Sequence, residues 1–113
     1  MVNGTPVQGD IIKISLDPKK GHEQQGYRPY ICLSHKIISE VANIAVFAPI
    51  SNTKRDYPFY IKLAGTQTTG SVLLDQIVTI DYNARKYNFV ESVPTAVINE
   101  LLETVVLVFQ PNE

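Results

Sequence analysis

The chain has 113 residues, of which 44% are apolar and 19% charged, and it carries a formal net charge of −1. These values predict one globular domain over residues 1–113, and they argue against a disordered chain or a surface covered in basic residues for non-specific nucleic-acid binding. No run approaches the roughly 20 apolar residues that cross a bilayer, and the first residues lack the pattern of a signal peptide, so we expect a cytoplasmic protein with no membrane partner.

The charges are distributed unevenly along the chain. Residues 1–62 carry eight Lys or Arg against five acids, a net charge of +3, whereas residues 63–113 carry two against six, a net charge of −4. An anionic ligand would therefore be attracted chiefly by the first half of the chain.

The first half predicts three strands. Residues 10–16 alternate in part between apolar and polar side chains and end at Asp17-Pro18, which is a turn signal. A second strand is expected over 30–34 and a third over 43–49, where β-branched and aromatic residues gather. The stretch 36–41 between them fits a helical turn or a short loop.

The second half predicts shorter strands followed by a helix. Residues 57–63 alternate, but Pro58 demotes this run to an edge strand. Residues 71–80 fit one strand or two short ones with Asp75-Gln76 between them, residues 81–86 a turn, and residues 87–93 a last strand. Beyond Pro94 the apolar residues follow a helical period, and this stripe should pack on the sheet; it consists of Val97, Ile98, Leu101, Leu102, Val105, Val106 and Phe109. The whole pattern predicts a small, partly closed antiparallel barrel capped by a C-terminal helix.

A polar stretch joins the first two strands and reads DPKKGHEQQGYRPYICLS over residues 17–34. Pro29 favours extended geometry at Arg28, so the guanidinium should be held where the loop enters the strand. Polar loops on a rigid sheet often carry binding or catalytic groups, which makes this stretch the first candidate for a functional site. Cys32 lies in its apolar end, where we expect a small core residue rather than a nucleophile.

Four blocks of sequence resemble the MazF/PemK (Kid) family of toxins from bacterial type II toxin–antitoxin systems. They are GDII, DPKKGHEQQGYRP with the apolar strand after it, APISNT with YPF shortly after, and GSVLLDQIVTID followed by AR. The resemblance implies a mainly β fold, a small SH3-like antiparallel barrel with a C-terminal helix as in CcdB and PemK. It also implies a homodimeric, metal-independent endoribonuclease that cuts single-stranded RNA, often mRNA. The implied partner is a MazE-like antitoxin that covers the site, with operator DNA bound, if at all, only by the toxin–antitoxin complex.

The resemblance implies three catalytic residues. Arg28 matches the arginine of the family's RP motif, Ser51 stands where the family commonly has threonine, and Glu23 matches the acid of the loop. Serine keeps the hydroxyl of threonine but rotates more freely about χ1. Tyr27 stands where some members have histidine, so chemistry that depends on that histidine is absent.

Further residues are predicted to contact RNA. Asp75 and Gln76 match a pair near the family's RNA groove, and Asp75 could accept base amino groups, as carboxylates do from cytosine. Lys54 and Arg55, facing Lys19 and Lys20 at one end of the sheet, could follow an RNA backbone. The whole set comprises Lys20, His22, Asn52, Thr53, Lys54, Arg55, Asp75, Gln76 and Arg85.

Cutting RNA without a metal requires an activated 2′-hydroxyl, stabilised charge on the phosphate and a proton for the leaving 5′-oxygen. The fork of Arg28 suits phosphate oxygens, and Ser51 would donate a hydrogen bond to the same phosphate. Glu23 or His22 would accept the 2′-hydroxyl proton, and the sequence does not choose between them. No metal or cofactor is expected, because the two histidines and one cysteine lack ligand spacing.

Each assignment has a purely structural alternative. Arg28 could pair with Glu23 or Asp17 on the surface, and Ser51 and Thr53 could cap a turn. The remaining alternatives are packing rather than base stacking for Tyr57 and Tyr82, and plain exposed loop positions for His22 and His35.

Two other functions remain open at this point. One is a non-enzymatic CcdB-like toxin that acts on DNA gyrase by protein contact, and the other is an inactive module that binds an antitoxin or DNA. The loop with Arg28-Pro29 favours the enzyme, and a chain that ends in FQPNE and contains no tryptophan does not resemble CcdB at its end. The serine at position 51 leaves the inactive module open.

Overall fold

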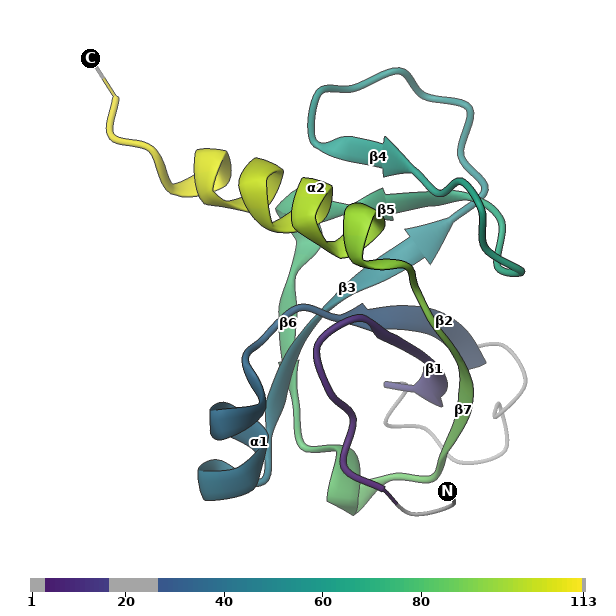
Figure 1. Cartoon of the computed structure of the whole chain (residues 1–113), viewed down its shortest axis with the longest axis vertical. Helices are drawn as coiled ribbons and strands as arrows, with labels where there is room; N and C mark the ends of the chain where they lie inside the picture. Colours follow the sequence, from purple (N-terminus) through teal and green to yellow (C-terminus); the bar gives the residue numbers. More distant parts are fainter. Residues whose placement is uncertain (1–3, 17–26, 113) are drawn as a thin grey trace.

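The computed structural model describes residues 4–16 and 27–112, which form an antiparallel sheet with a long helix laid across it (Figure 1). The seven strands are β1 (Asp10–Ser15), β2 (Tyr27–Cys32), β3 (Ala45–Ser51), β4 (Tyr60–Lys62), β5 (Ser71–Leu73), β6 (Val78–Ile80) and β7 (Tyr87–Ser92). Six of them follow the order β4-β5-β3-β2-β1-β7, and β6 pairs with the first half of β3. The mainly β fold with a C-terminal helix, expected from the sequence, is confirmed.

Helical segments join or follow the strands. They are α1 (Lys36–Ala42), α2 (Thr95–Val105) and three short 3-10 segments, η1 (Leu74–Gln76), η2 (Tyr82–Ala84) and η3 (Val106–Phe109). The helical alternative for 36–41 is therefore correct. His35 caps α1, because its Nδ1 accepts a hydrogen bond from the Ile37 amide at 3.1 Å. Of the two alternatives for 71–80, two short strands separated by η1 are observed.

The second strand differs from its expected bounds. β2 begins at Tyr27 rather than Tyr30, because β1 continues to Ser15 and pairs with it as Ile14↔Arg28 and Ser15↔Tyr27. Arg28 thus lies inside the strand and not in the loop before it. The run with Pro58 forms an edge strand in the described sheet, as expected, but β4 starts only at Tyr60.

Two hydrophobic clusters hold the fold together, one on each face of the twisted sheet. The first lies under α2, where Leu101 is fully buried and packs with Ile11, Ile31 and Val72. The second contains Cys32, Phe47 and Tyr82, so the expectation that Cys32 is a core residue is confirmed, and of the two alternatives for Tyr82 the packing one is observed.

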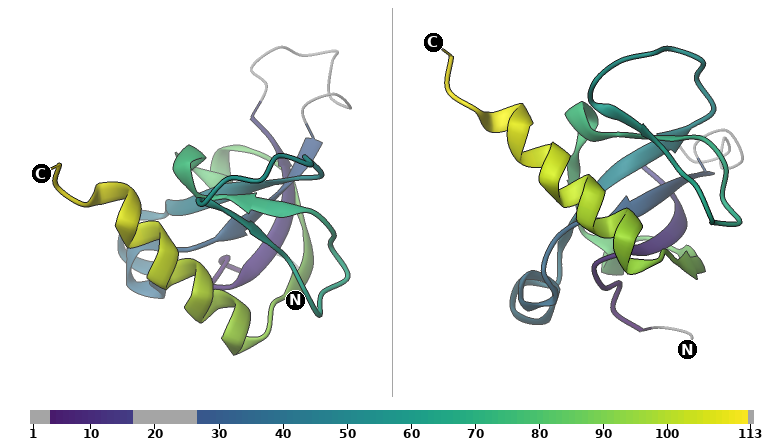
Figure 2. Two further views of the ribbon diagram at one scale, coloured as in Figure 1. Left: turned by 90° about the horizontal axis from the view of Figure 1, so that it is seen from above. Right: turned by 45° about the horizontal axis from the view of Figure 1, so that its top comes forward.

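The apolar stripe of the C-terminal helix packs on the sheet only in part. Val97, Ile98, Leu102 and Val105 lie against the first cluster. Val106 and Phe109 are instead 59% and 68% exposed, so the expectation that the whole stripe packs is wrong at its end. The reason is visible in Figure 2, where the helix extends past the edge of the sheet and η3 has no strand beneath it.

Candidate active site

Arg28 and Ser51 lie at neighbouring positions on two paired strands. β2 pairs with β3 in the register Tyr30↔Pro49, Ile31↔Ala48 and Cys32↔Phe47. Continued by two residues, this register sets Arg28 opposite Ser51, the last residue of β3. Directly opposed residues of an antiparallel pair point to the same face. The last pair observed between β2 and β3 is Tyr30↔Pro49, and Ser51 itself pairs with Ser71 of β5. The register therefore predicts that the two residues assigned to one phosphate share one end of one face.

The packing around both residues agrees with this placement. Alternation sets Arg28 on the side of Tyr30 and Ser51 on the side of Phe47, and these two aromatic residues share the second cluster. Burial raises the pKa of the Tyr30 phenol, and the positive charge of Arg28 offsets part of that rise. Arg28 is exposed and Ser51 half-buried, so both sit where the buried face opens to solvent.

The segment that leads into β5 lies close to the backbone of Ser51. Ser51 pairs with Ser71 in β5, and Gly70, with φ of +118°, approaches so tightly that a Cβ there would lie 2.6 Å from the backbone oxygen of Ser51. The Thr69 hydroxyl donates to Asn52 Oδ1 at 3.4 Å. No pattern in the sequence marks Gly70 as a close contact of Ser51.

A group of polar and aromatic residues surrounds the loop after β3. The guanidinium carbon of Arg55 lies 4.9 Å from the ring centroid of Tyr57 and 6.0 Å from that of Tyr60. Hydrogen bonding to the Asp75 carboxylate raises the pKa of the Tyr57 phenol. Gln76 Nε2 donates to the Tyr60 hydroxyl at 3.3 Å. We call these five residues the Arg55–Gln76 cluster.

The cluster unites three residues that the sequence placed in the RNA site with two tyrosines. The sequence predicts Arg55, Asp75 and Gln76 at the RNA site and leaves Tyr57 between packing and stacking, but it assigns no role to Tyr60. Tyr60 directly follows Phe59 in the run YPFY, and Phe59 contacts the first core cluster. Because side chains alternate between the two faces of a strand, Tyr60 points away from that cluster, and this alternation could have identified it.

The other predicted residues lie at several separate places. Asn52 and Lys54 are exposed, and the Thr53 hydroxyl accepts a hydrogen bond from the Arg55 amide at 3.2 Å, which is the turn contact considered as its alternative. Arg85 donates to the backbone oxygen of Ser15 at 2.9 Å, and Ser15 pairs with Tyr27 next to Arg28. Glu23, Lys20 and His22 lie outside the described residues, as does Lys19.

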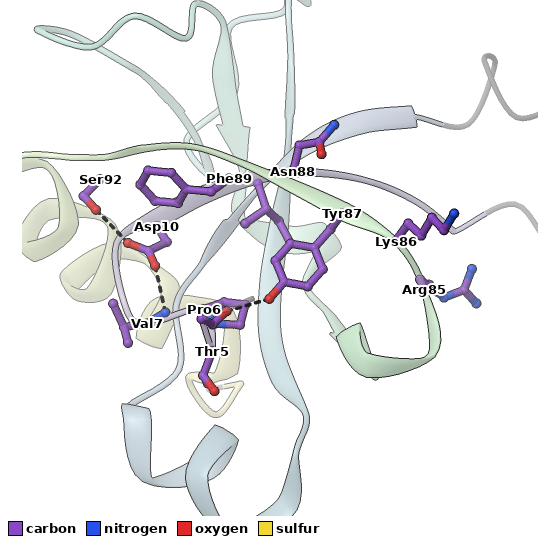
Figure 3. Close-up of a pocket in the computed structure, with 12 residues that line it drawn as sticks. Thr5, Pro6, Val7, Asp10, Arg85, Lys86, Tyr87, Asn88, Phe89 and Ser92 are labelled. Carbon is purple, nitrogen blue, oxygen red and sulfur yellow. Dashed lines mark hydrogen bonds between the residues drawn. The ribbon is translucent and has the colours of Figure 1, made fainter. Parts of the chain in front are cut away.

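A separate pocket lies between the N-terminal segment and β7 (Figure 3). The carboxylate of Asp10 accepts hydrogen bonds from the Val7 amide at 3.0 Å and from the Ser92 hydroxyl at 2.7 Å. The Tyr87 hydroxyl donates to the Gly4 carbonyl at 2.6 Å. These polar groups attach the N-terminal segment to the sheet, and Arg85 is the only predicted site residue among the described residues of the pocket wall.

The described residues offer neither a metal-binding group nor a membrane-spanning helix. Over residues 4–16 and 27–112, no three His, Cys, Asp or Glu side chains are grouped so as to hold a metal ion. Within the same part of the chain, no helix is both long and apolar enough to cross a membrane.

Known proteins with similar sequences and structures agree with this architecture. A family model described as "PemK-like, MazF-like toxin of type II toxin-antitoxin system" matches residues 7–109. Endoribonuclease PemK of Escherichia coli is 39% identical over 100 residues, which cover 84% of this chain and 75% of PemK. The crystal structure of MazF from Deinococcus radiodurans has a TM-score of 0.80 and 26% identity, covering 95% of this chain and 98% of MazF. A MazE–MazF structure (Form-III) from the same organism has a TM-score of 0.82 and 22% identity, covering 94% and 97%. The chain belongs to the PemK-like, MazF-like toxins of type II toxin–antitoxin systems.

Proposed function

We propose that the chain is an endoribonuclease toxin that cleaves single-stranded RNA without a metal ion. The proposal rests mainly on the register of β2 on β3: continued by two residues past its last pair, Tyr30↔Pro49, it would set Arg28 and Ser51 at the same end of the same face. A related protein at 39% identity, PemK, is an endoribonuclease by name. Family membership also favours this function over a CcdB-like action on DNA gyrase.

In this proposal Arg28 and Ser51 hold the phosphate that is cut. The adjacent 2′-hydroxyl attacks phosphorus, and the bond to the 5′-oxygen breaks while that oxygen takes up a proton from solvent water. The products are a 2′,3′-cyclic phosphate and a 5′-hydroxyl. The planar fork of Arg28 stabilises the negative charge that develops on the non-bridging oxygens. Ser51 donates one further hydrogen bond to the same group. Glu23 or His22, which lie outside the described residues, would accept the proton of the 2′-hydroxyl.

The Arg55–Gln76 cluster would bind the bases beside the cut. Single-stranded RNA is recognised by stacking of unpaired bases on aromatic or guanidinium planes and by hydrogen bonds to their edges. Tyr57, Tyr60 and Arg55 offer such planes, and the Asp75 carboxylate and Gln76 amide offer hydrogen-bonding groups. Asn52, Thr53 and Lys54 would contact the backbone between this cluster and the cut, and Lys20 and Arg85 would contact it beyond Arg28.

The proposal also includes an antitoxin, a second copy of the chain and operator DNA as partners. A MazE-like antitoxin would cover the site, since the Deinococcus radiodurans relative has been solved as a MazE–MazF complex. Val106, Leu107 and Phe109 leave 59%, 49% and 68% of their surfaces exposed, and this apolar end of the helix is our proposed contact for a homodimer. Operator DNA would be bound only by the toxin–antitoxin complex, and the cytoplasmic location stays a prediction.

The test is cleavage of a long RNA by the purified protein in the presence of EDTA, with the cut ends mapped and a DNA of the same sequence as substrate control. We expect discrete cuts in RNA and none in DNA, which lacks the attacking 2′-hydroxyl. Arg28→Ala should lower the rate by about 10²–10³ and Ser51→Ala by about 10², the range for one transition-state donor. Lys36→Ala in α1, which also removes an exposed cation but lies away from the site, is the matched control. Intact RNA would contradict the proposal and favour the inactive module.

A further inference from the structure

The loop between β4 and β5 is held by a single carboxylate on β7. Glu91 Oε2 accepts hydrogen bonds from the Thr68 amide and the Thr68 hydroxyl, both at 2.7 Å, and Glu91 Oε1 accepts one from the Gln67 amide at 3.1 Å. Two successive backbone N–H groups that face one anion form a nest. Hydrogen bonds to an ionised acceptor are roughly twice as strong as neutral ones, so Glu91 ties this loop firmly to a strand far away in sequence.

Glu91 lies on β7, which is held in place by its pairing with β1 and by core packing. Glu91 pairs with the fully buried Ile11 of β1, and the register then moves to Phe89, which leaves Val90 as an extra residue. Such a bulge turns neighbouring side chains to new directions, and Val90 packs on the first core cluster. Figure 1 shows the loop between β4 and β5 on the same side of the molecule as the end of β7.

The residues that follow Thr68 lead directly to the proposed site. Thr69 contacts Asn52, Gly70 lies against the backbone of Ser51, and Ser71 pairs with Ser51 across the sheet. The Gly70 carbonyl also accepts a hydrogen bond from the Leu63 amide at 2.9 Å. A shift of the loop at Thr68 would therefore be passed towards Ser51 through Thr69, Gly70 and Ser71.

We infer that Glu91 is a positioning residue for RNA cleavage, which sets the place of Ser51 through the segment 68–71 and does not touch RNA. This inference rests on the proposed function. A displaced hydroxyl donates poorly to the transition state while RNA still binds through the other contacts, so loss of Glu91 should lower kcat more than it raises KM.

Glu91→Gln is the sharpest substitution, because it keeps the size of the side chain. The amide has one oxygen in place of two, and its NH₂ group donates and so cannot receive the Gln67 or Thr68 N–H. We expect kcat to fall about 10-fold with KM within about twofold of the wild type. Thr68→Val, which removes only the hydroxyl donor, should show a smaller loss in the same direction. Glu40→Gln on the exposed side of α1 makes the same chemical change elsewhere and should leave kcat unaltered.

A double-mutant cycle separates positioning from general stability. If Glu91 acts through Ser51, Glu91→Gln should have no further effect on kcat in a Ser51→Ala background. An unchanged kcat for Glu91→Gln, or the same fractional loss in both backgrounds, would overturn the inference while RNA cleavage by the wild type still stood. A wild-type protein that leaves RNA intact would overturn the proposed function and this inference together.

Discussion

Replacing Gly70 by alanine tests the close contact that backs Ser51. The backbone of Gly70 has φ of +118°, a region that L-residues rarely adopt. A Cβ at this position would lie 2.6 Å from the Ser51 oxygen, 3.0 Å from the Ser51 carbonyl carbon and 3.0 Å from Asn52 Oδ1. Two of these three atoms belong to the backbone of β3, so β3 or the loop has to move.

The expected loss of stability has two parts. The strained backbone costs about 1–3 kcal/mol, and pushing packed atoms apart costs about 1–3 kcal/mol more. Gly70→Ala should therefore lower the free energy of unfolding by about 2–6 kcal/mol, out of about 5–15 kcal/mol for a typical domain. Gly65→Ala is the matched control: its φ is +74° and no atom lies within 4 Å of the added Cβ, so only strain of about 1–2 kcal/mol applies.

The assay is urea unfolding followed by far-UV circular dichroism, with all variants at one protein concentration so that any oligomerisation is held constant. Gly70→Ala should unfold at a clearly lower urea concentration than Gly65→Ala. Under conditions in which both variants are folded, Gly70→Ala should also cleave RNA more slowly, because Ser51 is displaced. Equal free energies of unfolding for the two alanine variants would refute the close approach of Gly70 to Ser51.

Two predictions follow from shifted pKa values. Burial by itself raises the pKa of Glu91, but its hydrogen bonds to Thr68 and Gln67 outweigh burial and leave the pKa below its usual value. The stability that this carboxylate contributes is thus complete above about pH 4.3 and is lost as the pH falls through the lower pKa of the folded state. The free energy of unfolding should therefore fall more for the wild type than for Glu91→Gln between about pH 6 and 3. Equal dependence on pH of the two free energies, measured by urea unfolding, would contradict this. Burial raises the pKa of the Cys32 thiol despite hydrogen bonding to Ser34. A bulky disulfide reagent should therefore react with Cys32 only as the protein opens. An immediate reaction with the native protein would contradict the burial of the thiol.

Local patterns in the sequence predicted most of the elements. Alternating apolar residues gave the strands, and a change of period after Pro94 gave α2. Pairing altered their ends: β2 gained Tyr27, Arg28 and Pro29, because an extended neighbour was available in β1. Exposure of Val106 and Phe109 was not foreseen, since a helical stripe says which residues share a face but not where the surface beneath that face stops.

The sequence alone determined the fold class, the family blocks and the candidates Arg28, Ser51, Asp75 and Gln76. Only the tertiary structure decided which of them come together. The expected opposition of Arg28 and Ser51 depends on strand order and register, where a slip of one residue would turn either side chain to the other face. The hydrogen bonds from Thr68 to Glu91 join residues that are 23 positions apart in the chain. No local pattern encodes such a contact, because these hydrogen bonds form only after β7 and the loop have packed on the same sheet.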